Sequence, residues 1–207
     1  MLRFSPSPIL RFISQDMGTP TPPPPVKLVI GLLSGDLALF TQATAKLQES
    51  YGSIDVESTV FPWTTTNYYR EEMGENLLRK FVAFEPLLSP EALVRIKLET
   101  NALELSLSGA TAPNTPRRVN LDPGYLDATK LVLASTKNQA HRIYLAQGIY
   151  AEVTLLYHHG EFHPFLYTYT DYRWPDTQEF LRRVRSRYLA QVRVRRGTVT
   201  LPGEGTS

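Results

Sequence analysis

VKLVIGLLSGDLALFTQATAKLQESYG, residues 26–52, is the stretch that decides the fold. It begins with a nearly continuous apolar run rich in β-branched residues, Val26–Leu33, which predicts a buried strand. A short turn follows, and its last residue, Asp36, is a favoured helix N-cap. The residues that follow place Leu37, Phe40, Thr44 and Leu47 at helical spacing, and the pattern stops at Gly52. The stretch therefore predicts a buried strand that leads directly into an amphipathic helix.

The chain after Gly52 continues the alternation of strands and helices. Ile54–Phe61 alternates in hydrophobicity and is ended by Pro62, and Leu78–Glu85 is a third candidate strand. Ser89-Pro90-Glu91 opens a second helix, with Ser at the N-cap and Pro just inside it. The far end of this helix, in ALVRIKLETNALELSL, also fits a strand. With one more strand, this order is β-α-β-β-α-β, as in ferredoxin-like folds.

The second half predicts antiparallel strands and a final helix. The strands are Arg118–Leu121, Lys130–Ser135, His141–Ala146, Ile149–Tyr157 and Phe162–Thr170, with hairpin turns at Gln147-Gly148 and His158-His159-Gly160. The helix, Asp176–Val194, carries one apolar stripe: Phe180, Val184, Tyr188 and Val192. We therefore expect an α+β fold, with a mixed, mainly antiparallel sheet, two or three packed helices and a ferredoxin-like first half.

Length and composition predict one domain. We expect residues 1–25 to be a disordered Pro-rich leader, with Met17 as an alternative start, residues 26–196 to form the α+β domain, and residues 197–207 to be a disordered tail. The net charge of +2 gives no global field for a nucleic acid or a membrane. No apolar run approaches the ~20 residues that span a bilayer. The chain has no cysteine, which excludes disulfides and thiolate chemistry and fits a cytoplasmic location.

Residues 117–125, RRVNLDPGY, form the first candidate site. Asp-Pro-Gly predicts a tight turn that would hold the Asp122 carboxylate at a strand end beside Asn120. Asp122 would then act as a general base or bind a hard cation, and Arg118 would bind an anion. The alternative is that Asp122 only organises its own turn.

Two further groups of polar residues follow. The turn that holds Ser135, Thr136 and Lys137 is suited to cradle a phosphate or carboxylate, or else it is a solvated polar turn. His141 and Arg142 begin a predicted strand, so alternation would send them to opposite faces. Glu152, which shares a face with Tyr150, is costly to bury alone and should meet His141, Arg142 or Lys137. That pair is either structural or catalytic.

Aromatic residues gather in two segments, around Trp63 and in residues 167–174, and together they would form two walls of one cleft. Asp171 and Arg173 belong to the second segment. His158, His159 and His163 cluster at one predicted turn, but exposed turn histidines are common, so we predict no metal site.

The last predicted helix is rich in arginine and has no acid from Arg182 to Arg196. Such a patch would contact RNA phosphates, or it is simply a solvated face.

The chain resembles a bacterial family catalogued as a domain of unknown function, whose members are often automatically labelled GTP-binding proteins. The resemblance covers roughly residues 27–191 and is carried by residues 61–74, RKFVAFEPL (79–87), RRVNLDPGYL (117–126), KLVLASTKN (130–138), residues 141–155 and TDYR (170–173). It implies no activity and no catalytic set. Classical GTPase chemistry is unsupported by the residues, because the sequence has no Gly-x-x-x-x-Gly-Lys-Ser/Thr loop.

Three hypotheses follow for the function. The first is a cleft that binds a small anionic ligand, such as a nucleotide, between the sheet and the aromatic segments. Its catalytic candidates are Asp122 and Glu152, and its ligand-binding candidates are Arg118, Asn120, Ser135, Thr136, Lys137, His141, Arg142, Tyr150, Asp171 and Arg173. The second is RNA association through the arginine helix, and the third is an interaction module without chemistry. The sequence identifies no cofactor, no oligomeric state and no reaction.

Overall fold

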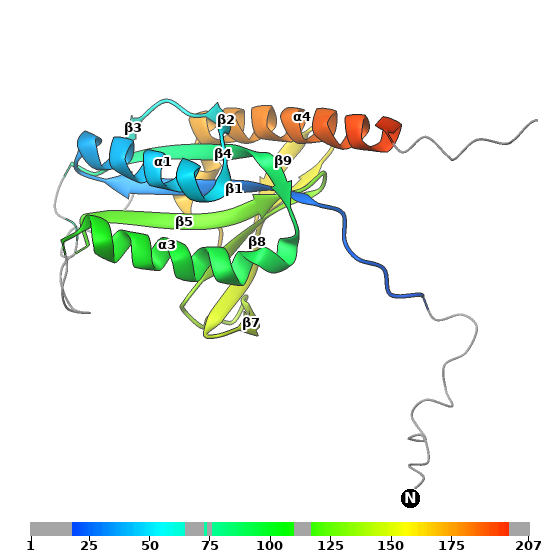
Figure 1. Cartoon of the computed structure of the whole chain (residues 1–207), viewed down its shortest axis with the longest axis horizontal. Helices are drawn as coiled ribbons and strands as arrows, with labels where there is room; N and C mark the ends of the chain where they lie inside the picture. The colour runs from blue at the N-terminus through cyan, green and yellow to red at the C-terminus, as the bar shows by residue number, and fades with distance from the viewer. Residues whose placement is uncertain (1–17, 65–72, 74–75, 110–116, 199–207) are drawn as a thin grey trace, which may run out of the picture.

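The computed structural model describes residues 18–64, 73, 76–109 and 117–198. The described chain forms a nine-stranded antiparallel sheet with helices on both faces (Figure 1). The predicted leader and tail lie largely outside the described residues. Within the described part, no helix is both long enough and apolar enough to cross a membrane.

The first half of the chain has ferredoxin-like topology, as expected. Its elements are β1 (Val26–Ser34), α1 (Leu37–Tyr51), β2 (Ile54–Glu57), β4 (Leu78–Leu88), α3 (Leu93–Leu107) and β5 (Val119–Leu126). These strands lie in the order β2-β4-β1-β5, and all neighbours are antiparallel. Short additions are β3 (Phe61–Pro62), which pairs with β4, and the 3-10 turn η2 (Pro90–Ala92), which opens α3 with Ser89 as its N-cap.

The second half extends the sheet beyond β5. It contains β6 (Lys130–Ser135), β7 (Ile143–Ala146), β8 (Ile149–His158), β9 (Glu161–Pro164), η3 (Thr170–Arg173) and α4 (Pro175–Thr198). The order continues β5-β6-β8-β7, and β9 pairs with β8. Both predicted hairpin turns are present, and each has two consecutive residues with positive φ: Gln147 and Gly148, then His159 and Gly160.

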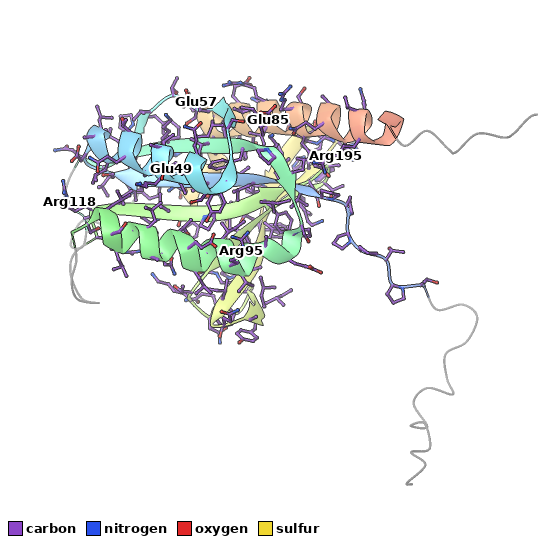
Figure 2. All side chains as sticks on the ribbon, viewed as in Figure 1. Glu49, Glu57, Glu85, Arg95, Arg118 and Arg195 are labelled. Atoms are coloured by element: carbon purple, nitrogen blue, oxygen red, sulfur yellow. The ribbon has the colours of Figure 1, made fainter. Side chains whose placement is uncertain are left out.

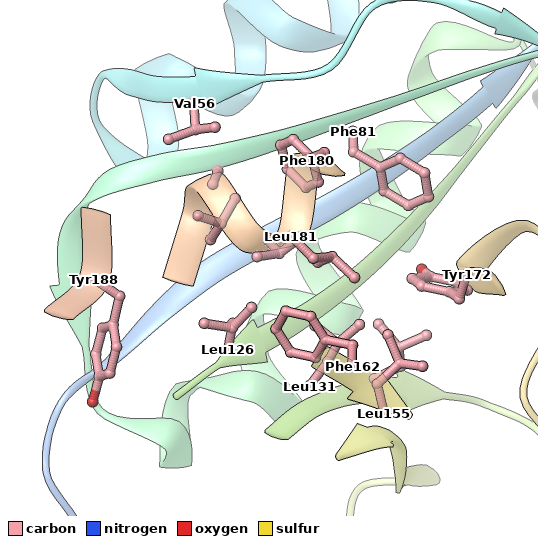
Figure 3. Packing of buried hydrophobic residues seen from close by; sticks show 14 of the residues in the cluster. Val56, Phe81, Leu126, Leu131, Leu155, Phe162, Tyr172, Phe180, Leu181 and Tyr188 are labelled. Atoms are coloured by element: carbon pink, nitrogen blue, oxygen red, sulfur yellow. The ribbon is translucent and has the colours of Figure 1, made fainter. Parts of the chain in front are cut away.

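The two faces of the sheet bury separate cores, because successive residues of a strand point to opposite sides. Leu28, Ile30 and Leu32 of β1 pack with α1 and α3. Val29 faces the other way, into the core covered by α4. Figure 3 shows this second core, where Phe180 and Leu181 lie over Phe81 and Leu126. The predicted stripe of α4 is confirmed, since Phe180, Val184 and Tyr188 are buried.

Several sequence-based boundaries are wrong. Residues 54–61 form two strands, β2 and β3, and α3 stays helical to Leu107. Residues 165–170 do not continue β9, and α4 runs four residues further than expected. The largest error concerns Asp122-Pro123-Gly124, which is not a turn but the middle of β5.

Pro123 and Gly124 fit a strand interior here for two reasons. In a strand, backbone groups alternate in direction, so the nitrogen of Pro123 points the same way as the Leu121 amide, away from β1. The pairing of β5 with β6 begins only at Gly124, so Pro123 loses no ladder hydrogen bond. A Cβ on Gly124 would lie 2.3 Å from the Val132 carbonyl oxygen, so glycine is required for the close approach of β6.

Candidate functional site

The candidate site is a cavity of about 260 Å³ where β5 and β6 separate. The two strands pair only from Gly124 to Leu126, which we call the closed segment of β5. Along Val119–Pro123, the open segment, β1 is the only described strand that pairs with β5. The cavity is lined by Trp63, Arg79, Lys97, Asn101, Glu104, Leu105, Arg117, Asn120, Asp122, Leu133, Ala134, Ser135, Thr136, Lys137, Arg142, Glu152, Tyr169, Asp171 and Tyr172.

Side chains of α3 replace the missing strand partner of the open segment. Glu104 Oε1 accepts a hydrogen bond from the Leu121 amide at 2.7 Å, and Lys97 Nζ donates to the Leu121 carbonyl at 3.0 Å. Both side chains are buried. Burial raises the pKa of Glu104, although the charges of Lys97 and Arg117 oppose the rise. Both backbone groups of Leu121, on the unpaired edge of β5, are thus satisfied by charged side chains that also line the cavity.

Arg79 crosses the sheet to reach the cavity. It extends from β4 over Gly31 of β1, where a Cβ would lie 2.6 Å from the Arg79 Nη2 atom. Its guanidinium forms ion pairs with Asp122 at 2.9 Å and with Asp171 at 3.1 Å. It also lies 4.6 Å from the centre of the Phe81 ring. A buried arginine that pairs with two carboxylates fixes one wall of the cavity.

The two carboxylates held by Arg79 differ in their protonation behaviour. Burial opposes the ionisation of Asp122, but the charges of Arg79 and Lys97 outweigh it and lower the pKa of Asp122. Asp171 is only 1% exposed, and burial raises its pKa despite the charge of Arg79. Two acids on one cation with opposite shifts are typical of sites where one group stays ionised and the other tends to be neutral.

Glu152 organises a second wall of the cavity. Its Oε2 atom accepts from Arg142 Nε at 2.7 Å and lies 3.0 Å from His141 Nε2. The prediction that Glu152 meets His141 or Arg142 is confirmed. The prediction that these two residues point to opposite faces is wrong, because His141 lies in a turn and β7 begins only at Ile143. The His141 ring also stacks on Tyr167, with ring centres 4.1 Å apart.

The predicted anion cradle after β6 is partly occupied by the protein itself. Ser135 Oγ accepts hydrogen bonds from the Lys137 amide at 3.1 Å and from Arg142 Nη1 at 2.7 Å. Arg142 also donates to the Lys137 carbonyl and, through Nη2, to the Tyr169 hydroxyl. Arg142 therefore ties this turn to Glu152 and to the aromatic segment before η3.

Most of the residues predicted from sequence do converge on the cavity. Its lining includes eight of them: Asn120, Asp122, Ser135, Thr136, Lys137, Arg142, Glu152 and Asp171. His141 is not in the lining but contacts Glu152. The two aromatic segments also meet there, through Trp63, Tyr169 and Tyr172; residues 65–72 lie outside the described chain.

Three predicted ligand-binding residues lie elsewhere. Arg118 is at the periphery (Figure 2), where it pairs with Asp36 at 3.0 Å. Arg173 donates to three backbone carbonyls of residues 165–168 and so holds the loop before η3. Tyr150 packs edge-to-face on Tyr144. The sequence places these side chains near the right strand ends but does not show which way each one points.

Three cavity residues, Arg79, Lys97 and Glu104, were not predicted from the sequence, and Arg117 lies in the first candidate site but was given no role there. The sequence did contain a pattern that could have identified the two residues of α3. Lys97 and Glu104 recur at helical spacing with Leu93, Ile96 and Thr100 on the buried side of α3. Charged residues on the buried face of a helix require buried partners, and here the partners are the open backbone of β5 and Arg117.

The arginines of α4 are largely engaged within the protein. Arg183 and Arg185 donate to backbone carbonyls of residues 57 and 128, and Arg187 pairs with Asp55. Arg182 pairs with Glu179 on the same helix. These contacts reduce the charge available for RNA, and RNA binding stays a prediction. Across the described residues, no group of three or more histidine or acidic side chains is arranged to hold a metal ion.

Comparison with known proteins gives a family but no activity. The family model described as "Domain of unknown function (DUF4416)" matches residues 24–188. This range includes every residue that lines the cavity. No curated protein and no solved structure matches the chain.

Proposed function

Because this chain belongs to the family described as a domain of unknown function (DUF4416), we propose its function from the β5–β6 cavity: it binds a small anionic ligand there. The observation that carries the proposal is a cavity at the place where the pairing of β5 with β6 ends, whose lining contains five cationic side chains. Where the pairing ends, charged side chains of α3 contact the backbone of the open segment in place of β6.

The charge of the lining favours an anion. Its five cationic residues, Arg79, Lys97, Arg117, Lys137 and Arg142, face four acids, Glu104, Asp122, Glu152 and Asp171. Burial raises the pKa values of two of the acids, Glu104 and Asp171. Even with all four acids ionised, the lining carries one positive charge in excess, which favours an anionic ligand.

The size and chemistry of the cavity limit the ligand further. Its volume of about 260 Å³ lies just below the ~300–1,000 Å³ of common small-molecule sites. The ligand is thus of mononucleotide size or smaller. Hydroxyl, amide and carboxylate groups are interspersed with the cations, so the ligand carries hydrogen-bonding groups beside its charge. Asp122, which is 29% exposed and paired with Arg79, is the carboxylate suited to accept a hydrogen bond from a ligand hydroxyl.

A ligand panel tests the proposal. The full chain is unfolded thermally with inorganic phosphate, sugar phosphates, nucleoside monophosphates, dicarboxylates or Mg²⁺. An anion at a hundred times its Kd should stabilise the fold by about 2.7 kcal/mol. Asn101→Asp, which adds a negative charge to the lining, should weaken that effect. Gln42→Glu adds the same charge to an exposed position of α1 and should not. If no anion stabilises the protein, or both variants behave alike, the proposal is wrong.

A further inference from the structure

Lys97 is a buried cation with unused hydrogen-bonding capacity. The residue is 6% exposed and lines the cavity. An ammonium has three donor hydrogens. Within the described residues, Lys97 uses only one of them, in its bond to the Leu121 carbonyl. Two donors therefore remain on a charged group that is almost fully removed from solvent.

Each of the four acids that line the cavity already forms an ion pair with an arginine. Arg79 holds Asp122 and Asp171, Arg117 holds Glu104, and Arg142 holds Glu152. Glu104 and Asp122 feel the charge of Lys97, but no described carboxylate lies within ion-pair distance of its nitrogen. A buried charge without a partner is strongly unfavourable. Lys97 is thus the buried lining cation that an incoming anion would neutralise.

Asn120 adds a second donor next to the Lys97 contact. It precedes Leu121, is 4% exposed, and its Oδ1 atom accepts from Arg117 Nη1 at 3.1 Å. Its Nδ2 atom is buried and has no hydrogen-bond partner among the described residues at ordinary bonding distance and angle. The Asp122 carboxylate lies close enough for this amide to help lower the Asp122 pKa, and so can take one of the two amide hydrogens, which leaves the other for a ligand.

We propose that Lys97 and Asn120 form the subsite that receives a phosphoryl group of the ligand. This inference rests on the proposed function and names the part of the cavity that binds the charge. The two free hydrogens of Lys97 and the amide of Asn120 offer at least three donors. A phosphoryl group presents three strong acceptor oxygens, whereas a carboxylate presents two. Helix α3 and strand β5 thus supply the charge and the hydrogen bonds from opposite sides of the open segment.

The test measures the affinity of the full chain for inorganic phosphate and for acetate, from thermal unfolding at constant ionic strength. Lys97→Met and Asn120→Asp should each weaken phosphate binding at least about tenfold, because each removes a charge-assisted contact or adds a repulsive charge. Lys46→Met removes an exposed lysine, with a side chain 58% exposed, and should change the affinity less than about twofold. Acetate should bind at least about tenfold more weakly than phosphate. Asn120→Asp keeps the side-chain shape and decides the question if Lys97→Met does not fold.

Two results would overturn this assignment alone. Phosphate binding that is equal in the wild type and both cavity variants would place the anion at another part of the cavity. Acetate binding as tight as phosphate binding would exclude a phosphoryl subsite. In both cases the proposed function would stand. If neither phosphate nor any other anion of the panel stabilises the wild type, the proposed function and the subsite fall together.

Discussion

The open and closed segments of β5 belong to the same strand but are completed in different ways. The closed segment, Gly124–Leu126, pairs with β1 on one side and β6 on the other. The open segment pairs with β1 alone among the described strands, and side chains of α3 take the place of β6. A sheet can thus end its ladder in mid-strand while charged side chains of a neighbouring helix satisfy backbone groups of the unpaired edge, as at Leu121. The closed segment thus contributes a complete backbone ladder to the sheet, whereas the open segment borders the cavity.

Of the substitutions around the open segment, loss of Arg79 should lower the free energy of unfolding most. Arg79→Met leaves Asp122 and the buried Asp171 without their cation, which should cost about 3–5 kcal/mol in the free energy of unfolding. Chemical denaturation measures this cost. Arg95→Met removes an exposed arginine that pairs with Glu99, and should cost less than about 1 kcal/mol. Equal losses in the two variants would show that Arg79 does not hold the two acids.

The closed segment is tested by Gly124→Ala. The new Cβ would meet the Val132 carbonyl oxygen, a backbone atom that cannot move without disturbing the β5–β6 pairing. We expect a loss of about 2–3 kcal/mol, as for overpacked cores. Gly18→Ala is the control, since no atom lies within 4 Å of its Cβ position. Full stability of Gly124→Ala would mean that the two strands do not approach this closely.

Glu104 tests whether a side chain takes the place of β6 as the hydrogen-bond partner of the open segment. Glu104→Leu leaves the Leu121 amide without its acceptor and should cost about 1–2 kcal/mol. Glu104→Gln keeps an acceptor oxygen at the same position and should retain most of that stability. Hydrogen exchange of the Leu121 amide gives a second readout, and it should accelerate in the leucine variant only. Similar exchange in both variants would contradict the role of Glu104.

The smallest effect is the pH dependence of the Asp122 contribution. The pKa of Asp122 is lowered from 3.8 in the folded protein, whereas the unfolded chain keeps the ordinary value. The unfolded chain therefore binds the proton more tightly, and the stability from Asp122 is lost as pH falls through the folded pKa. The free-energy difference between the wild type and Asp122→Asn should be constant above about pH 5 and should shrink at lower pH. A difference that grows on acidification would contradict this sign.

The sequence predicts the fold well because local patterns decide it. Continuous apolar residues predict β1, four-residue spacing predicts the stripe of α4, and glycine marks both hairpin turns. The β-α-β-β-α-β order then leads to the ferredoxin-like half. Patterns of this kind depend on residues close together in the sequence, so they can be recognised without knowledge of tertiary contacts.

The site is predicted only in part, because its decisive contacts are not local. Asp-Pro-Gly has the composition of a turn, but its pairing with β1 makes it a strand, and the absence of a β6 partner at Pro123 permits the proline there. Arg79 reaches Asp122 across 43 residues of sequence and over a second strand. Side-chain direction also misled the prediction for Arg118 and Arg173, whose partners are Asp36 and backbone carbonyls. Such partners become visible only once the strands are in place.

The most direct measurement for the central claim is a nitrogen-15 NMR titration of the full chain with inorganic phosphate. If the gap between β5 and β6 is an anion site, the amides of the open segment and of residues 133–137 should shift together and saturate. The amides of Tyr125 and Leu126 and of the β8–β9 turn should remain nearly unchanged. Shifts that are confined to α4, or that spread without saturation over exposed lysines and arginines, would contradict the account.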